Sequence, residues 1–233
     1  MLGVMGAMEV EVQTVLGALH QPSERQVLGQ QVAQGRLDGV PLLVAQSGIG
    51  KVNAAMAVAA LAQAGATAIV FTGMAGGVGP AVHIGDAVVA TQLVQHDVDV
   101  TNFGHEPGHI PGEPLAWAAD AALADALAAA AQELGATVHL GTIASGDQFI
   151  ADPERAAAIA ARFHALAVEM EGAAAAQAAA RCGIPIAVLR WISDTADETS
   201  TADSAAFSER IGDLDLGVVR ALIPVAAQLG RQA

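Results

Sequence analysis

The fold class is decided by residues 172–194, which read GAAAAQAAARCGIPIAVLRWISD. The alanine-rich first half predicts a helix over Gly172–Arg181, because alanine has the highest intrinsic helix propensity. The tripeptide Gly183-Ile184-Pro185 interrupts this pattern and leads into an apolar run, Ile186–Ile192, which has the length of a buried strand. A helix followed by a continuous apolar strand is typical of a parallel sheet that helices cover on both faces.

The same alternation extends outward from this stretch along the rest of the chain. The sequence predicts strands at 2–8, 32–37, 40–46, 68–72, 86–95, 138–145 and 165–168, and further helices at 10–19, 51–63, 117–134, 153–163 and 205–229. Asp38-Gly39 favours a type I′ turn, so the second and third of these strands should form a hairpin. We therefore expect one α/β domain over residues 1–233, with a central mixed, mainly parallel β-sheet flanked by helices on both faces.

Composition and charge exclude several classes of protein. The chain has 24 acidic and 10 basic residues, a formal net charge of −14, and Lys51 is its one lysine. Such a surface repels phosphate backbones and anionic lipids, so neither a nucleic acid nor a membrane is expected as a partner. The start of the chain lacks the basic segment of a signal peptide, and glycines interrupt the uncharged segment 52–85. We therefore expect a soluble, cytoplasmic protein.

The cysteine, histidine and glycine patterns predict neither a metal nor a cofactor. Cys182 is the single cysteine, and the seven histidines show neither HxH nor HExxH spacing. The glycine-rich segments 47–51 (SGIGK) and 72–77 (TGMAGG) match neither the Walker pattern nor GxGxxG. They are either tight turns with close backbone packing or loops that approach a small ligand, and the sequence leaves both interpretations open.

Ionisable side chains stand at the ends of the predicted strands, where open α/β sheets bind ligands. Arg190 interrupts the last strand and Asp194 ends it, and position alone slightly favours a buried ion pair over a ligand site. Glu171 precedes a helix, so helix capping is its alternative role. Glu9 and Glu11 point about 200° apart on a helix, and periodicity does not decide which one faces a site. The pattern indicates acid–base chemistry on a polar, uncharged substrate.

Seven motifs, in order along the chain, carry a resemblance to a known family. They are GAMEVE (6–11), SGIGK (47–51), TGMAGG (72–77), HDVDVT (96–101), SGDQFI (145–150), VEME (168–171) and ISD (192–194). Together they closely resemble the 5′-methylthioadenosine/S-adenosylhomocysteine nucleosidases, which belong to the nucleoside phosphorylase superfamily. Each motif alone is weak, but the set extends over nearly the whole chain.

The resemblance implies hydrolysis of an N-glycosidic bond, with release of adenine and a 5-thioribose product from a small nucleoside substrate. It implies that Asp194 is the general acid toward N7 of adenine and that Glu11 activates the attacking water, with Arg190 nearby. It places Glu171 on the ribose hydroxyls and Phe149 against the purine ring. The implied substrate-binding residues are Met8, Ile49, Ala75, Gly76, Phe149, Ile150, Met170, Glu171, Arg190, Ser193, Val100, Phe103 and Phe207.

The resemblance also implies a homodimer, in which the segment Val100–Phe103 supplies apolar residues to the partner's site. Met8, Ile49 and Phe207 would line a pocket for the alkylthio group. The chain departs from the family at position 74, where methionine replaces the serine of many relatives, and in the segment 195–207, which has few aromatic residues.

Three other functions fit parts of the pattern. A phosphorolytic enzyme of the same superfamily needs several cationic donors for phosphate, whereas the motifs supply only Arg190, and Glu11 would repel the anion. A nucleosidase for aminodeoxyfutalosine would bind the purine and ribose in the same way, and the sequence does not separate its substrate from methylthioadenosine. A non-catalytic nucleoside-binding protein would not need all three carboxylates.

Overall fold

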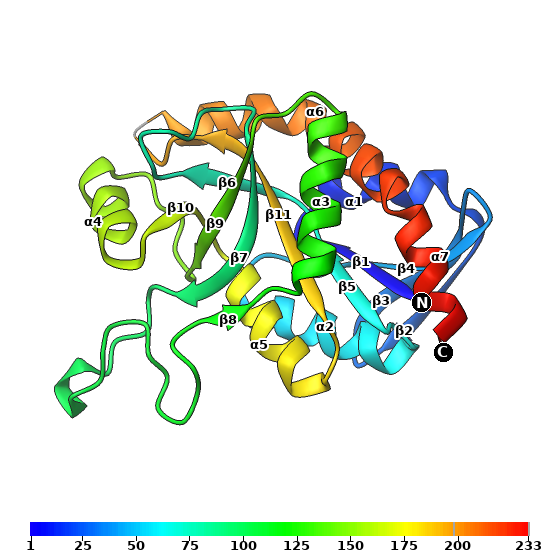
Figure 1. Cartoon of the computed structure of the whole chain (residues 1–233), viewed down its shortest axis with the longest axis horizontal. Helices are drawn as coiled ribbons and strands as arrows, with labels where there is room; N and C mark the ends of the chain where they lie inside the picture. The colour runs from blue at the N-terminus through cyan, green and yellow to red at the C-terminus, as the bar shows by residue number, and fades with distance from the viewer. Residues whose placement is uncertain (198, 233) are drawn as a thin grey trace.

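The computed structural model describes the backbone of residues 1–197 and 199–232 and side chains as far as residue 228, and it confirms an α/β fold (Figure 1). The strands are β1 (Leu2–Gly6), β2 (His20–Val27), β3 (Gln30–Leu37), β4 (Val40–Gln46), β5 (Ala68–Phe71), β6 (Met74–Gly77), β7 (Ala87–Gln95), β8 (Trp117–Ala118), β9 (Val138–Ser145), β10 (Ala165–Glu169) and β11 (Ile186–Asp194). The helices are α1 (Glu9–Ala18), α2 (Lys51–Ala64), a 3₁₀ turn (Thr101–Phe103), α3 (Ala121–Glu133), α4 (Pro153–Phe163), α5 (Gly172–Cys182), α6 (Ser200–Ala221) and α7 (Ile223–Gln232).

The strands form one mixed sheet with the order β2-β3-β4-β1-β5-β11-β6-β10-β9-β7-β8. The long strand β11 holds its two halves together. It pairs in parallel with β5 through Ile186–Val188, antiparallel with β7 through Leu189–Trp191, and in parallel with β6 from Trp191 onward. The pairing of β11 with both β6 and β7 closes β11, β6, β10, β9 and β7 into a ring, a closure that the sequence analysis did not predict.

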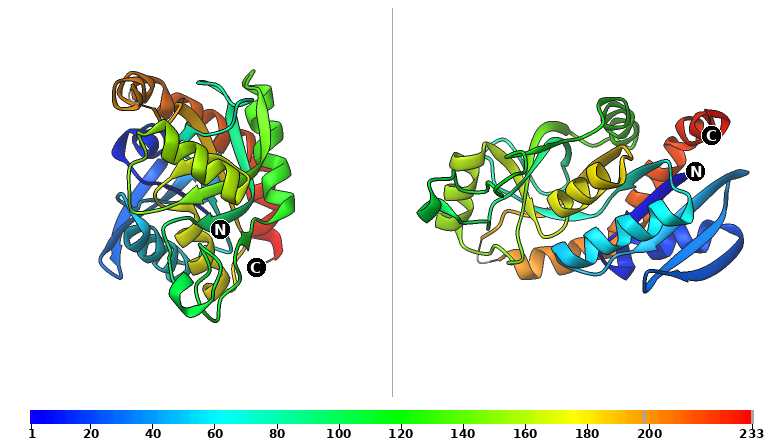
Figure 2. Two further views of the ribbon diagram at one scale, coloured as in Figure 1. Left: turned by 90° about the vertical axis from the view of Figure 1, so that its left-hand side faces the viewer. Right: turned by 90° about the horizontal axis from the view of Figure 1, so that it is seen from below.

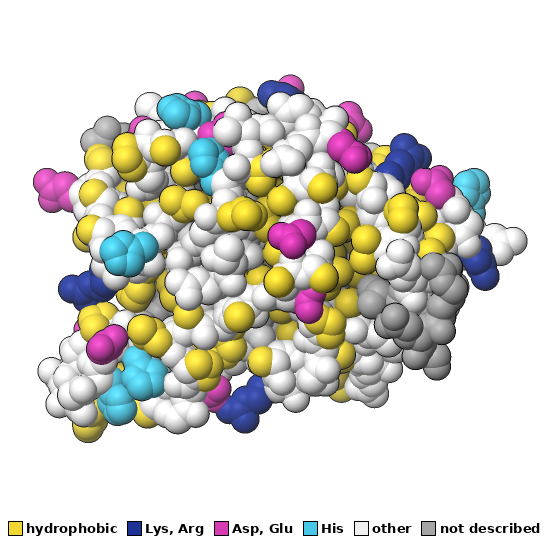
Figure 3. Space-filling model, viewed as in Figure 1, with side chains coloured by type: hydrophobic (Ala, Val, Ile, Leu, Met, Phe, Trp, Pro, Cys, Tyr) yellow, Lys and Arg dark blue, Asp and Glu magenta, His cyan; other side chains and the backbone are white. Residues whose placement is uncertain are grey.

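Helices cover both faces of the sheet, as expected. Helices α2 and α5 lie on one face, and α1, α3 and α6 lie on the other (Figures 1 and 2). Each side has its own buried apolar cluster, which includes Leu61 of α2 on the first face and Leu127 of α3 on the second. The basic side chains coloured in Figure 3 lie around the edge of that face, whereas hydrophobic side chains spread over its centre. Among the described helices, none is long and apolar enough to cross a membrane.

The predicted hairpin is confirmed, since β3 and β4 pair antiparallel around Asp38 and Gly39. Both turn residues have positive φ, +49° and +84°, as a type I′ turn requires. The strand before it, β2, was not predicted, because it is an exposed and polar edge strand that contains Pro22. The short strands β6 and β8 were missed as well.

Two helix boundaries differ from the prediction for local reasons. The helix expected from Trp117 begins only at Ala121, because Trp117 pairs with β7 and the carboxylate of Asp120 accepts a hydrogen bond from Leu123 N–H as the helix cap. The last helix begins earlier than expected, at Ser200, and divides into α6 and α7 near Pro224, which has no N–H to continue the helical bonding.

Candidate active site

A cavity of about 210 Å³ opens where the end of β1 approaches β6, β10 and β11. Its walls come from segments that are far apart in the sequence but meet at one end of the ring of strands. The lining residues are Ala7, Met8, Glu11, Ile49, Met74, Ala75, Gly76, Gln148, Phe149, Ile150, Val168, Glu169, Met170, Glu171, Ser193, Asp194 and Ser204.

Glu11, in the first turn of α1, points its carboxylate back at the end of β1. Its Oε2 accepts hydrogen bonds from the backbone N–H groups of Ala7 (2.6 Å) and Met8 (2.9 Å), and its Oε1 accepts one from Met74 (3.0 Å). Only 3% of Glu11 is exposed, whereas Glu9 lies in solvent, so the tertiary structure decides the choice that periodicity left open.

The surroundings of Glu11 also set its protonation. Burial raises the pKa of its carboxyl above the ordinary value, and the charge of Arg190 and the three backbone hydrogen bonds oppose that rise. Gly73 makes the close approach of β5 and β6 to this carboxylate possible. A Cβ on Gly73 would lie 2.6 Å from Oε1 of Glu11, and the residue has a φ of +152° that suits glycine.

Asp194 ends β11 and is 3% exposed. Its Oδ2 accepts a hydrogen bond from the Ser193 hydroxyl (2.8 Å), and its Oδ1 accepts one from the backbone N–H of Ala196 (2.9 Å). Ala196 makes this contact from a left-handed conformation with a φ of +54°, a strained backbone of the kind found at functional sites. The carboxyl is therefore held from two sides, and about two of its four acceptor positions are used.

Glu169, which lines the cavity, forms a buried ion pair with Arg190 behind it. Oε2 of Glu169 lies 2.7 Å from Nη2 and 3.2 Å from Nε of Arg190, and the guanidinium stacks on Phe71, with Cζ 3.9 Å from the ring centroid. Oε1 of Glu169 accepts a hydrogen bond from Ser145 Oγ, and its Oε2 also accepts one from the Gly172 N–H at the start of α5 (2.7 Å). Glu169 therefore caps α5, which is the alternative role that the sequence had suggested for Glu171.

Glu171 is 6% exposed, and its carboxylate accepts a hydrogen bond from a distant segment instead of capping α5. Its Oε1 accepts a hydrogen bond from the backbone N–H of Gly50 (2.7 Å), just before α2. Burial, with repulsion from Glu169 and Glu11, raises the pKa of Glu171 to about 7, although Arg190 and the Gly50 hydrogen bond oppose the rise. This carboxyl therefore changes its charge near neutral pH.

The segment after β9 supplies the aromatic wall of the cavity. Phe149 lines it with 55% of its surface exposed, and the adjacent Ile150 is 5% exposed. An aromatic face that is open to solvent in the mouth of a cavity is suited to stack on a planar ring. Met8, Ile49 and Met74 add apolar and thioether surface to the other walls.

Four residues that the sequence analysis selected lie outside this cavity. Arg190 is 1% exposed and lies behind the cavity, where its guanidinium forms an ion pair with Glu169. Phe207 is buried between α6 and the sheet in the cluster that also holds Ile211, so Ser204, about one turn earlier, lines the cavity in its place. Val100 and Phe103 also lie outside the cavity, and Phe103 is 82% exposed.

Some lining residues were not selected from the sequence, namely Ala7, Met74, Gln148, Val168, Glu169 and Ser204. Glu169 had a usable signal, since it alternates with Glu171 and shares its side of the strand end. Within the described residues, no group of three or more histidine, cysteine, aspartate or glutamate side chains has an arrangement that would hold a metal ion.

Comparison with known proteins places this site in a family. The model of the phosphorylase superfamily matches residues 1–224. The 5′-methylthioadenosine/S-adenosylhomocysteine nucleosidase of Geobacillus thermodenitrificans is 39% identical over 232 residues, 98% of each chain. The nucleosidase of the same name from Neisseria meningitidis, in complex with methylthio-immucillin-A, superimposes with a TM-score of 0.89 at 36% identity and 95% and 97% coverage. Futalosine hydrolase of Helicobacter pylori gives 0.90 at 34% identity and 96% and 97% coverage. The chain therefore belongs to the 5′-methylthioadenosine/S-adenosylhomocysteine nucleosidase family of the phosphorylase superfamily.

Proposed function

We propose that this chain hydrolyses the N-glycosidic bond of 5′-methylthioadenosine and S-adenosylhomocysteine, releasing adenine and the 5-thioribose product. The observation that carries the proposal is the meeting of three buried carboxyl groups, Glu11, Glu171 and Asp194, at one cavity, each with different hydrogen-bond partners. Buried carboxyls in different surroundings suit the separate acid, base and binding roles of glycoside hydrolysis. The names of the relatives support the same substrates.

In this proposal Asp194 donates a proton to N7 of adenine as the C1′–N9 bond breaks, so that the base leaves as a neutral molecule. The Ser193 hydroxyl orients that carboxyl through its bond to Oδ2. Glu11 accepts a proton from the water that attacks C1′, and its burial favours a stronger base. Glu171 would bind the ribose hydroxyls and stabilise the positive charge that develops on the sugar.

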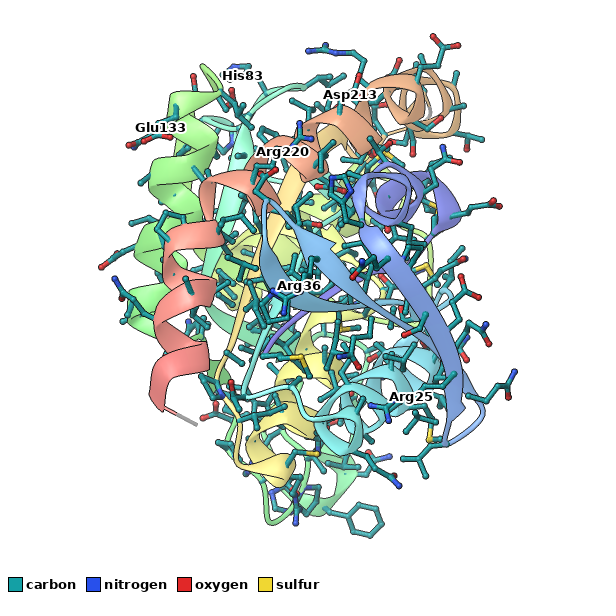
Figure 4. The ribbon with its side chains drawn as sticks, turned by 90° about the vertical axis from the view of Figure 1, so that its right-hand side faces the viewer. Arg25, Arg36, His83, Glu133, Asp213 and Arg220 are labelled. Atoms are coloured by element: carbon teal, nitrogen blue, oxygen red, sulfur yellow. The ribbon has the colours of Figure 1, made fainter. Side chains whose placement is uncertain are left out.

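The cavity walls favour water over phosphate as the nucleophile. Among the residues that the structure describes, those that line the cavity include no lysine or arginine, whereas a phosphate anion needs such donors. Arg190 is already bonded to Glu169. Arg25, Arg36 and Arg220 lie on the side of the molecule drawn in Figure 4, where Arg25 bonds the carbonyl of Ala64. The resulting negative field at the cavity would repel the anion.

An aminodeoxyfutalosine nucleosidase is the second candidate, because a futalosine hydrolase superimposes as well as the methylthioadenosine enzymes do. The purine and ribose positions would be the same in both cases. The walls formed by Met8, Ile49 and Met74 favour an apolar alkylthio group at the 5′ position. Comparing kcat/KM for the two nucleosides separates these candidates.

We also propose that the active enzyme is a homodimer. Several large apolar side chains are exposed near the cavity mouth and on the adjoining α2, and Phe103 would reach the partner's site from the Val100–Phe103 segment. The exposed fractions are 54% for Ile49, 75% for Val52, 40% for Met56 and 82% for Phe103. Exposed apolar patches of this kind mark protein interfaces. Analytical ultracentrifugation at several protein concentrations would detect the dimer.

The test of the main proposal is adenine release from methylthioadenosine, first in phosphate-free buffer and then with phosphate. Turnover without phosphate, giving free methylthioribose, is expected. Turnover only with phosphate would overturn the hydrolase assignment. The Glu11→Gln variant should bind the nucleoside but lose turnover, since its amide no longer accepts a proton. Unchanged turnover would remove Glu11 from the mechanism.

A further inference from the structure

Three loops meet beside the cavity in a closed ring of hydrogen bonds, which we call the Lys51 ring. Nζ of Lys51 donates to Oδ1 of Asp97 (2.7 Å) and to Oε1 of Gln95 (3.1 Å). Oδ2 of Asp97 accepts a hydrogen bond from the backbone N–H of Asp147 (2.9 Å). Oδ1 of Asp147 accepts one from the backbone N–H of Lys51 (2.8 Å), which closes the ring.

The Lys51 ring supplies a helix cap that the local sequence does not provide, and it keeps a partly buried carboxylate charged. Helix α2 begins after Gly50, which has no side chain to cap the helix, so Asp147 takes that role from another loop. Burial alone would raise the pKa of Asp97, but the hydrogen bonds from Lys51 and Asp147 prevail and lower it, so that the carboxylate stays charged. The side chains of Lys51 and Asp97 are only 18% and 15% exposed, which limits screening by solvent and salt.

The ring is linked to the cavity wall at two points, through Asp147 and through Lys51. Asp147 immediately precedes Gln148 and Phe149, which line the cavity. Lys51 follows Gly50, whose N–H holds Glu171. Gly50 has a φ of +98°, and a Cβ there would lie 3.1 Å from Oδ1 of Asp147, so this close approach depends on glycine. The ring thus fixes both the aromatic wall and the partner of Glu171, although none of its three residues lines the cavity itself.

We propose that Lys51, Asp97 and Asp147 are positioning residues that hold Phe149 over the cavity and thereby set the affinity of the site for its planar base. This inference rests on the proposed function, because it takes the Phe149 segment as the purine-binding wall. The two proposals can be tested separately, because the ring bonds to neither Asp194 nor Glu11, the groups to which the proposed mechanism gives the proton transfers.

The test compares Lys51→Met and Asp97→Asn with the conservative Lys51→Arg variant. The control is Asp120→Ala, which removes the cap of α3, a helix that contributes no residue to the cavity. For each protein we would measure kcat and KM for methylthioadenosine, the Kd of free adenine by calorimetry, and the free energy of unfolding. Loss of a charge-assisted hydrogen bond changes an equilibrium constant about tenfold or more. KM and the adenine Kd should therefore rise about tenfold in Lys51→Met, with kcat within about threefold.

Two further results are expected if the ring acts as a unit. Lys51→Arg should recover part of the adenine affinity, and the Lys51→Met, Asp97→Asn double variant should bind adenine about as weakly as either single variant. Asp120→Ala should lose stability while its adenine Kd stays unchanged. If the ring variants lose stability in the same way and also keep the adenine Kd of the wild type, their role is merely structural and the inference is overturned.

The outcomes also separate this inference from the proposed function. If wild-type protein binds adenine and the ring variants bind it about tenfold more weakly, but wild-type protein releases no adenine from methylthioadenosine, the assigned reaction fails and the ring stands. If wild-type protein turns over and the ring variants keep KM and the adenine Kd, the ring fails and the reaction stands. If wild-type protein neither binds adenine nor turns over, both fail.

Discussion

Replacing Glu171 with glutamine should make the stability of the chain less dependent on pH. Glu171 is 6% exposed, and its pKa in the folded chain is raised from 4.5 to about 7, first by burial and then by repulsion from Glu169. Such a rise corresponds to about 3 kcal/mol of penalty on the ionised form. The stabilising contribution of the neutral carboxyl is complete below pH 4.5 and is lost as the pH rises through about 7.

The size of this effect follows from the pKa of Glu171, which is 4.5 in the unfolded chain and about 7 in the folded one. Between pH 5 and pH 8 the unfolding free energy of the wild type should fall by about 2 to 3 kcal/mol relative to Glu171→Gln, because only the wild type has an ionisable group at position 171. The assay is urea unfolding of both proteins, without ligand and at equal concentration, in steps of half a pH unit. Glu9→Gln is the matched control, since it removes the same charge from an exposed position on α1.

The direction in which the stability difference changes with pH decides the outcome. A difference between wild type and Glu171→Gln that stays flat, or that grows in favour of the wild type as the pH rises, would show that Glu171 ionises at least as easily in the folded chain as in the unfolded one. Burial and the Glu169 charge would then not control this carboxyl. A difference that Glu9→Gln reproduces would assign the effect to the net charge of −14 instead of the cavity.

Three further changes test other parts of the structure. Gly73→Ala places a Cβ 2.6 Å from Oε1 of Glu11, so kcat/KM should fall about 100-fold in a chain that keeps its circular dichroism spectrum, and an unchanged kcat/KM would contradict the position of Glu11. Asp215→Asn should stabilise the chain increasingly as the pH rises, because burial and repulsion from Glu11 raise the pKa of Asp215 well above its ordinary value. The amide would still accept the hydrogen bond that Trp191 donates to Asp215 (3.1 Å). Thermal unfolding from pH 6 to 9 measures this effect, and a destabilised variant would speak against a neutral Asp215. Asp120→Ala should cost about 1 kcal/mol in urea unfolding through loss of the α3 cap, and a variant as stable as the wild type would show that the cap is not used.

The sequence predicted those parts of the fold whose signals are local. The strand Val138–Ser145 and the helix Pro153–Phe163 have the predicted bounds, and the Asp38-Gly39 turn is of the predicted type. Strands stabilised by their neighbours escaped prediction, since the polar β2 has no apolar pattern and is held by pairing with β3. The closure of the ring through β11 and β7 likewise depends on contacts between distant segments.

The same limit applies to the candidate site. The motifs placed Glu171 and Asp194 at strand ends, and the cavity includes both. Local periodicity gave no preference between Glu9 and Glu11, because three backbone N–H groups from two separate segments select Glu11. The resemblance placed Phe207 in the cavity, but the rotation of α6 against the sheet decides which side chain faces inward, and that rotation depends on packing.

The charges around Arg190 explain how one arginine serves a site without contacting it. Glu169 accepts the hydrogen bonds that Arg190 donates. The positive charge of Arg190 lowers the pKa values of Glu11, Glu171 and Asp215, but burial has a larger effect and raises them. Four buried carboxyls therefore share one buried cation, and the excess negative charge is relieved partly by protonation. A positive charge that develops in the cavity would meet an environment already arranged to stabilise it, at no cost in reorganisation. An incoming anion would meet the opposite, and this difference supports the proposal that the nucleophile is water and not phosphate.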